Sequence, residues 1–392
     1  METRNVVDSS VDLLQSPISS KHIRLRHHSL PGDKDAITRD TGRTTHSRLP
    51  AKRRKPPNHG IRRQRASWTW KIPLLVIATL LLFYALDPSE SNIISPFISL
   101  SYRVQQGPND PSPPQYGKGP RDIAFVAFYT LVLFAARELV TRELLRPLAA
   151  SYGMTSRRRQ AQFAEQAYVA LYTGVVGPLG AHVMYRSPTW YFSTAGMYAG
   201  YPHATHAAPA KAYYLVQAAF WAQQALAMAL GLEARRRDFR ELVAHHVVTV
   251  ALIGLSYRFH FTMMGVLVYV THDISDFFLA TSKVLNYLES PLQGPYYALC
   301  IAVWIYLRHY INLGILRSIL TEFRTVGPYG LDWEAGQYKC AASGVITFAL
   351  LAALQALNLF WLWCLLRNGY RFIAMGVAGD DREEDEEVSR SG

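Results

Sequence analysis

Two pairs of ionisable residues lie inside long apolar runs of this sequence. His245 and His246 fall near the start of one run, and Asp273 and Asp276 fall within the next. An ionisable side chain inside a membrane is costly and usually marks a functional site. A carboxylate beside an imidazole fixes the tautomer of the ring and stabilises its charged form. These residue types therefore predict acid–base or nucleophilic chemistry.

Helix geometry allows the depths of these residues to be compared. If the run 242–259 enters the membrane from the cytoplasm, His245 lies about 6 Å below that edge at 1.5 Å per residue. On the returning helix, Asp276 and Asp273 lie about 7 and 12 Å below the same edge. The aspartates are three residues apart and share a helix face, whereas consecutive histidines point about 100° apart. We expect one histidine to react and the other to orient or support it.

Two other interpretations of the four residues stay open. They could form a polar network with a purely structural role. They could also hold zinc or iron, but the histidines are adjacent rather than four residues apart, and no His-rich segment recurs. The scattered Cys300, Cys340 and Cys364 suit neither a disulfide framework nor a zinc site. We expect no metal and no cofactor.

Eight apolar runs must position these residues. A transmembrane helix needs about 20 apolar residues, within a range of about 17–25. The runs cover residues 68–86, 122–141, 163–184, 212–232, 242–259, 262–281, 296–320 and 343–366. The first and fifth are the weakest candidates. The predicted fold is an all-α membrane protein of about eight transmembrane helices, six or seven of which surround a central lipid cavity.

Basic residues indicate which loops face the cytoplasm. Arginines follow the second and fourth runs, at 157–159 and 235–237, and Lys283 follows the sixth, while the intervening loops hold few basic residues. Because cytoplasmic loops are rich in Lys and Arg, we expect both termini in the cytoplasm. His203 and His206 lie in a loop of low charge, and no special role is expected for them. The net charge of +12 fits this topology, and no basic patch interleaved with aromatic residues indicates nucleic-acid binding.

Composition divides the chain into four segments. Residues 1–66 are polar and basic, and we expect a disordered cytoplasmic segment there. Residues 67–157 hold the first two transmembrane helices and their loops. Residues 158–372 form the expected catalytic transmembrane domain, and residues 373–392 an acidic cytoplasmic tail. No internal repeat of the kind that builds secondary transporters is evident.

Further charged residues flank or enter the apolar runs. Arg236, Arg237 and Lys283 could bind an anionic head group or a nucleotide phosphate, or could only anchor the helices at the membrane edge. Arg308 and His309 lie in the middle of the seventh run, where they either line a cavity or form structural pairs.

The region around the histidines resembles the Lag motif of ceramide synthases, which carry a TLC domain. The matching residues are RRDFRELVAHHVVT at 236–249, Ser256, Tyr257, Gly265, HDISD at 272–276, Lys283, Asn286 and Tyr287. Upstream segments at 187–190, 200–203, 211–214 and 220–224 are similar to the same family. The resemblance covers roughly residues 160–370.

Ceramide synthases transfer a fatty acyl group from acyl-CoA to the amine of a sphingoid base in the endoplasmic reticulum. The resemblance implies this reaction and location, with acyl-CoA as co-substrate and a long-chain base as acceptor. It places the active site on His245, His246 and the two aspartates, and it implies substrate contacts for Ser256 and Tyr257. The basic N-terminal and acidic C-terminal segments resemble the fungal branch. Some fungal members work with a small single-span subunit, so such a subunit or a homodimer is a candidate partner.

Acyl transfer from a thioester requires a deprotonated amine and a stabilised tetrahedral oxyanion. A histidine with a carboxylate partner can act as the base, or it can attack the thioester and form an acyl-imidazole. We favour the covalent route on His245, with His246 and the aspartates orienting groups and moving protons. The alternative function is a non-enzymatic TLC-domain protein, either a translocation helper or a lipid carrier. Those relatives generally lack the histidine pair.

Overall fold

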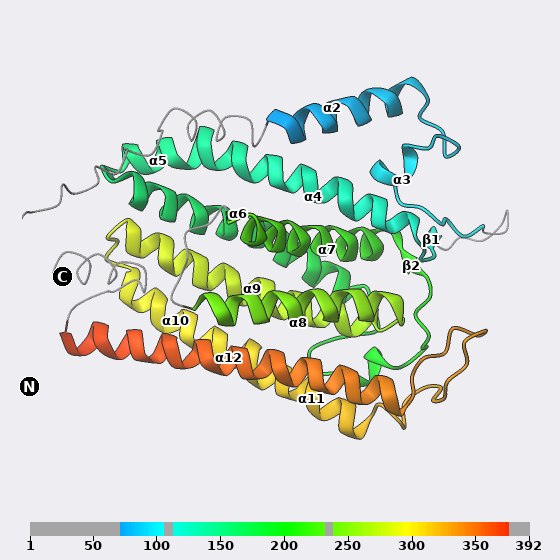
Figure 1. The fold of residues 1–392 in the computed structure, drawn as a ribbon. Helices are drawn as coiled ribbons and strands as arrows, with labels where there is room; N and C mark the ends of the chain where they lie inside the picture. The colour runs from blue at the N-terminus through cyan, green and yellow to red at the C-terminus, as the bar shows by residue number, and fades with distance from the viewer. Residues whose placement is uncertain (1–70, 106–112, 232–237, 376–392) are drawn as a thin grey trace, which may run out of the picture. The chain divides into compact units, whose positions relative to one another are not determined.

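The computed structural model describes residues 71–105, 113–231 and 238–375, and these parts of the chain are mostly helical (Figure 1). In chain order the elements are α2 (Lys71–Leu86), α3 (Ser95–Ile98), β1 (Gln115–Tyr116), α4 (Arg121–Leu139), the π-helix η1 (Val140–Leu145), α5 (Arg146–Ser151), α6 (Arg157–Tyr185), the 3-10 helix η2 (Thr194–Met197), β2 (His206–Ala207), α7 (Ala208–Ala229), α8 (Phe239–Arg258), α9 (Thr262–Tyr287), α10 (Gln293–Ile305), the π-helix η3 (Tyr306–Ile311), α11 (Asn312–Thr321) and α12 (Ala341–Met375).

Six helical segments of the described chain are long and apolar enough to cross a membrane. They are Arg121–Ser151, Arg157–Tyr185, Phe239–Arg258, Thr262–Tyr287, Gln293–Thr321 and Ala341–Ala374. The first joins α4, η1 and α5, and the fifth joins α10, η3 and α11. The predicted class, an all-α multi-pass membrane protein, is confirmed. The strands β1 and β2 form one short antiparallel pair.

The predicted count of eight spans is not confirmed. All eight apolar runs fall largely in helices, but α2 has only 16 residues. Such a helix is about 24 Å long, against about 30 Å for a hydrocarbon core. Helix α7 is longer but more polar, and its Lys211, Gln217 and Gln223 are fully buried. The first run is too short to count as a membrane span, and the fourth is too polar because one of its faces carries buried polar residues.

Helix α9 is the most buried of the six segments. It packs most extensively along α6 and also contacts α7, α8, α10 and η3. Gly180 on α6 permits part of this approach, since a Cβ there would come within 2.8 Å of Val270 and 2.3 Å of the Tyr213 hydroxyl. Helix α12 packs on α8, and α4 packs on α7. These contacts place α7, α8, α9 and α12 around the predicted site.

The α8–α9 turn, the β1–β2 pair and the segment before α12 lie at one end of these helices (Figure 1). The pairing Tyr116↔His206 joins the segment before α4 to the segment before α7. The ring of His260, in the α8–α9 turn, stacks on Tyr338 with a centroid separation of 5.7 Å. The two histidines of α8 lie toward its opposite, N-terminal end.

Candidate active site

His245 and His246 lie in the second turn of α8 and are 6% and 9% exposed. Trp221 of α7 packs edge-on against both rings, with centroid separations of 5.3 and 5.9 Å. Trp361 of α12 packs in the same way on His245, at 5.2 Å. Such edge-to-face aromatic contacts hold the rings in defined orientations. The histidine pair is therefore fixed by two neighbouring helices.

The two rings differ in their hydrogen bonds. His246 Nδ1 lies 2.8 Å from the carbonyl oxygen of Leu242. Since a carbonyl can only accept, Nδ1 carries the proton and a neutral ring presents its lone pair at Nε2. His245 Nδ1 is buried and has no hydrogen-bond partner among the described residues. Buried polar atoms normally have partners, so His245 retains unused hydrogen-bonding capacity at the site.

A polar cavity of about 230 Å³ lies beside the histidines. Its polar wall is formed by Arg137, Glu165, Gln166, Gln224, Asp238, His245, His246, Asp276, Lys283, Arg308 and Asn368. Seven helical segments of the described chain contribute to it, namely α4, α6, α7, α8, α9, α10 with η3, and α12. Three of the four predicted catalytic residues therefore share one cavity.

Arg308 enters this cavity from the π-helix η3. Its Nη2 lies 2.5 Å from Asp276 Oδ1, and its Nε and Nη1 donate to Ser275 and Asn358 at 2.6 and 3.1 Å. The guanidinium also lies 4.2 Å from the ring centroid of Trp304. π-Helical turns are frequent at functional sites. This one places a guanidinium, paired with an aspartate, in the wall next to the histidines.

Asp273 points to a different group of side chains. Its Oδ2 accepts hydrogen bonds from the hydroxyl of Tyr213, at 3.0 Å, and from Gln217 Nε2. The amide oxygen of Gln217 in turn accepts from Tyr172 at 3.0 Å. Asp273 is not part of the polar cavity wall. It anchors α9 to α7 and α6 one helical turn away from Asp276.

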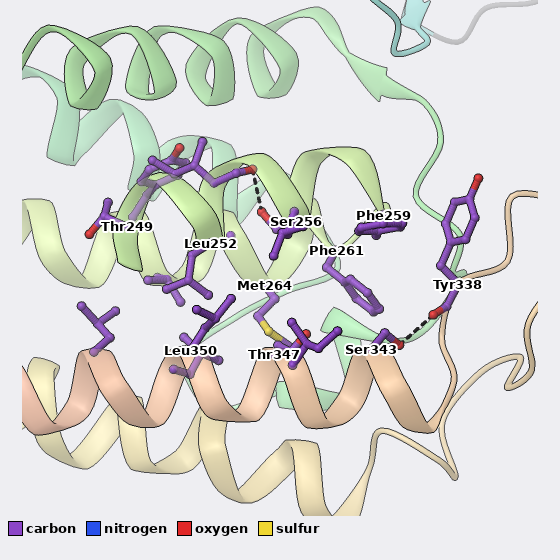
Figure 2. Close-up of a pocket in the computed structure, with 18 of the residues that line it drawn as sticks. Thr249, Leu252, Ser256, Phe259, Phe261, Met264, Tyr338, Ser343, Thr347 and Leu350 are labelled. Atoms are coloured by element: carbon purple, nitrogen blue, oxygen red, sulfur yellow. Dashed lines mark hydrogen bonds between the residues drawn. The ribbon is translucent and has the colours of Figure 1, made fainter. Parts of the chain in front are cut away.

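A second cavity, of about 300 Å³, lies between α7, α8, α9 and α12 and is almost wholly apolar. Figure 2 shows its α8 residues Leu252 and Ser256 facing Thr347 and Leu350 of α12. It extends to Trp333 and other residues of the segment before α12. The hydroxyl of Ser256 is hydrogen-bonded to that of Tyr214. This chamber has the apolar lining expected for a hydrocarbon chain.

His245 and Trp221 line both cavities. The reacting end of an amphipathic molecule could thus meet His245 while its apolar part lies in the chamber. Among the described residues, no group of three or more His, Cys, Asp or Glu side chains is arranged to hold a metal ion. The geometry is that of a histidine at a polar–apolar junction.

Comparison with known proteins identifies the family of this chain. The family model described as the TLC domain matches residues 162–367. A sphingosine N-acyltransferase-like protein of Gibberella moniliformis is 49% identical over 368 residues, covering 90% of this chain and 95% of the relative. This chain belongs to the TLC-domain family. A sphingosine N-acyltransferase of Schizosaccharomyces pombe is 43% identical, covering 82% of this chain and 83% of the relative. A ceramide synthase of Saccharomyces cerevisiae is 44% identical, covering 82% and 76%.

The TLC domain matched at residues 162–367 runs from α6 to α12, and the sequence-predicted domain is 158–372. Both cavities lie mainly within it, and the lining residues from outside are Arg137 of α4 and Asn368 of α12. The resemblance to ceramide synthases predicted from the Lag motif is confirmed by these relatives.

The predicted substrate contacts have different positions in the TLC domain. Lys283 lines the polar cavity, and Ser256 lines the apolar one. Tyr257 is in neither cavity, and its hydroxyl donates to Asp122 Oδ2 at 2.8 Å. Arg236 and Arg237 lie outside the described residues.

Tyr257 belongs to a polar cluster at the far end of the helices. There Lys211 Nζ lies 2.7 Å from Asp122 Oδ1, and Lys118 Nζ lies 3.2 Å from His260 Nδ1. Burial, together with the nearby charge of Lys211, lowers the pKa of Lys118 to about 7. Burial and the charge of Lys118 also lower the pKa of His260 to about 4.

His203 and His206, for which no special role was expected, are buried, with 9% and 5% of their surface exposed. His206 Nε2 lies 3.0 Å from the hydroxyl of Thr262. Burial and the charge of Lys118 lower the pKa of His206 to about 2. The pairing of β1 with β2 buries this segment, and nothing in the local sequence indicates that pairing.

Sequence reasoning left the role of Arg308 open and did not single out Trp221 or Trp361. The two roles considered for Arg308 were a structural pair and a place in a cavity wall. The structure shows both, because Arg308 is ion-paired and also lines a cavity. His309, by contrast, lines neither cavity, and its Nδ1 is hydrogen-bonded to Gln355 at 2.7 Å. The feature of the sequence that pointed to a functional role for Arg308 was its charge in the middle of an apolar run.

Proposed function

We propose that this protein is a ceramide synthase, which transfers a fatty acyl group from acyl-CoA to the amine of a sphingoid base. The names of the relatives support acyl transfer and the acceptor. The observation that carries the proposal is the position of His245, at the junction of a polar and an apolar cavity. An acyl thioester and an amine attached to a long chain are both amphipathic and suit such a junction.

The walls of the two cavities suggest how substrates lie. The polar cavity carries Arg137, Lys283 and Arg308 beside Glu165, Asp238 and Asp276, and its cations can pair with the phosphate groups of CoA. The chamber offers almost no polar surface, which favours hydrocarbon. The thioester carbonyl would lie beside His245, between the two environments.

In the covalent route, an imidazole nitrogen of His245 attacks the thioester carbonyl. The C–S bond breaks and CoA leaves as the thiol after gaining a proton, so an acyl-imidazole remains. The amine then attacks this carbonyl, the bond to the imidazole breaks, and the surplus amine proton passes through a base to the released ring nitrogen of His245. His246 Nε2 has the lone pair for this step, and Arg308 supplies positive charge near the oxyanion.

The four predicted catalytic residues have distinct roles in this proposal. His245 reacts, His246 moves protons, Asp276 holds Arg308 in place, and Asp273 fixes α9 against α7. We also propose residence in the endoplasmic reticulum with both termini cytoplasmic, so that CoA stays on the cytoplasmic side. A small single-span subunit or a second copy of the chain is the proposed partner.

The direct test uses the purified full-length protein in lipid nanodiscs with acyl-CoA and sphinganine. Mass spectrometry of the lipid product should detect dihydroceramide from the wild type. His245→Ala and Asp276→Ala should each lower the rate by at least about a hundredfold, the usual size of an acid–base or nucleophile loss. His182→Ala, at an exposed histidine of α6, is the matched control and should retain activity. A wild type that binds base and acyl-CoA without forming product would favour the carrier function instead.

A further inference from the structure

His272 presents an unused hydrogen-bond acceptor in the wall of the apolar chamber. It is 4% exposed and lines the chamber together with His245. Its Nδ1 lies 2.8 Å from the carbonyl oxygen of Val268, so Nδ1 carries the proton. Its Nε2 is buried and has no partner among the described residues. A neutral ring in the chamber wall therefore carries a buried lone pair that has no partner in the described chain.

Thr249 adds an unused hydroxyl to the same chamber. It lies one helical turn after His245 and so shares its face of α8. A helical threonine commonly donates to the carbonyl four residues back. Thr173 and Thr271 do so here, at 2.7 and 2.6 Å. The hydroxyl of Thr249 is buried without any such partner in the described chain, and the residue is part of the chamber wall (Figure 2).

An unpartnered nitrogen alone would not indicate a ligand. His309 Nε2 is also buried without a partner among the described residues, but His309 lines neither cavity. His272 and Thr249 differ from it because both line the same chamber, from facing helices α9 and α8. With His245 Nδ1 and the Tyr269 hydroxyl, they make four buried polar groups on residues of this wall that have no hydrogen-bond partner in the described chain. Such a group of unsatisfied polar atoms is best explained by polar groups of a bound molecule.

The chemistry of the proposed substrates indicates which molecule this is. A fatty acyl chain has only C–H groups beyond its carbonyl and satisfies neither residue. A sphingoid base carries hydroxyl groups on both carbons next to its amine-bearing carbon. Those hydroxyls can donate to His272 Nε2 and exchange a hydrogen bond with Thr249.

We infer that His272 and Thr249 recognise the hydroxyl groups that flank the amine of the sphingoid base. This inference rests on the proposed function and adds a specificity site to it. The two hydrogen bonds orient the head group in the chamber so that its amine faces His245. A site built to bind a substrate hydroxyl discriminates against an analogue that lacks it, because its own polar groups are left unpaired.

The experiment measures the preference for hydroxylated bases within single enzyme preparations. Sphinganine competes with 1-deoxy and 3-deoxy analogues of the same chain length, and the product ratio is read by mass spectrometry. The wild type should favour sphinganine over at least one analogue by about tenfold or more, the value of one buried hydrogen bond. Because the ratio comes from one preparation, the amount of folded protein cancels.

Thr249→Val removes the hydroxyl with little change in shape, and His272→Leu removes the ring acceptor. Each should lower the ratio toward one by slowing reaction of sphinganine but not that of the deoxy base. His272→Gln keeps an acceptor and should retain part of the preference. His309→Leu, which removes the unpartnered nitrogen outside the cavities, is the control and should leave the ratio unchanged.

The outcomes separate this inference from the function beneath it. A ratio that stays at the wild-type value in Thr249→Val and His272→Leu, with product still formed, overturns the inference and leaves the function intact. If His272→Leu is inactive with every base, the product ratio of Thr249→Val alone tests the inference. A preference that instead follows a 2-hydroxyl group on the acyl-CoA overturns the assignment to the base. No N-acylated product from the wild type would count against the function itself.

Discussion

Arg308 Nη2 and Asp276 Oδ1 lie 2.5 Å apart, joining η3 to α9 in the wall of the polar cavity. The guanidinium is 3% exposed, and the aspartate, 26% exposed, opens toward the cavity. An unpaired charge at this depth would be very costly. The ion pair therefore keeps the Arg308 guanidinium next to the histidines. Without Asp276, a charge in these apolar surroundings would be strongly disfavoured.

Removing one member of this ion pair should destabilise the protein. Arg308→Met leaves Asp276 without its ion-pair partner, and Asp276→Asn leaves Arg308 without its partner. Each change should lower the free energy of unfolding by about 3–5 kcal/mol. The double variant should unfold at a higher temperature than either single variant, yet none of the three should make ceramide. Thermal unfolding in detergent and the nanodisc assay measure the two effects. Arg142→Met, which breaks a more exposed pair with Glu138, should change stability by less than about 1 kcal/mol. Additive effects of the two changes at the buried pair would contradict this coupling.

The covalent route predicts an acylated protein. With acyl-CoA and no sphingoid base, intact-mass spectrometry should detect one added acyl group, and peptide mapping should place it on His245. His245→Ala should abolish the adduct. His246→Gln, with His245 in place, should still form it but discharge it slowly when base is added, because His246 then lacks its Nε2 lone pair. Full turnover without any detectable adduct would favour His245 acting as a general base.

The apolar chamber predicts how acyl chain length is limited. Thr347 of α12 lines the chamber opposite α8 (Figure 2). Thr347→Phe adds bulk to the wall and should shift the products toward shorter acyl chains when a mixture of acyl-CoAs is supplied. Val345 on the same helix is 69% exposed and lines neither cavity, so Val345→Phe is the matched control. An unchanged product distribution in Thr347→Phe would mean that the acyl chain lies elsewhere.

Much of the site could be predicted from local sequence. Helix rise alone indicated that His245, His246 and Asp276 lie at similar depth, and the structure places them around one cavity. The same reasoning grouped Asp273 with them. Residues three apart share a face only broadly, and the hydroxyl of Tyr213 and the amide of Gln217 hold Asp273 on the α7 side.

Features that depend on distant segments were not predictable. The π-helical turn that carries Arg308 inserts an extra residue per turn, which shifts the helical faces beyond it. His206 is buried because its strand pairs with a strand about 90 residues earlier, and Trp361 meets His245 only because α12 packs on α8. These contacts arise from packing between helices and not from the periodicity within one helix.

Lys118 leads to a prediction about pH and stability. Its Nζ lies 3.2 Å from His260 Nδ1 and 3.5 Å from the hydroxyl of Thr262, and 5.1 Å from the ring centroid of Tyr257. Burial and the charge of Lys211 lower its pKa to about 7, outweighing the opposite effect of Asp122. An unfolded lysine titrates near pH 10.4, so between about pH 7 and 10 the unfolded chain binds more protons at this residue.

The destabilising effect of Lys118 is therefore complete below pH 7 and is relieved as the pH rises toward 10. Lys118→Met removes the effect and should raise the unfolding temperature clearly at pH 6.5, but only slightly at pH 9.5. Scanning fluorimetry of the detergent-purified protein at both pH values measures this difference. Lys211→Met is the contrasting variant, since it leaves Asp122 without its buried ion-pair partner and should lower the unfolding temperature at both pH values. An equal gain for Lys118→Met at the two pH values would mean that Lys118 keeps its proton in the folded protein throughout this range.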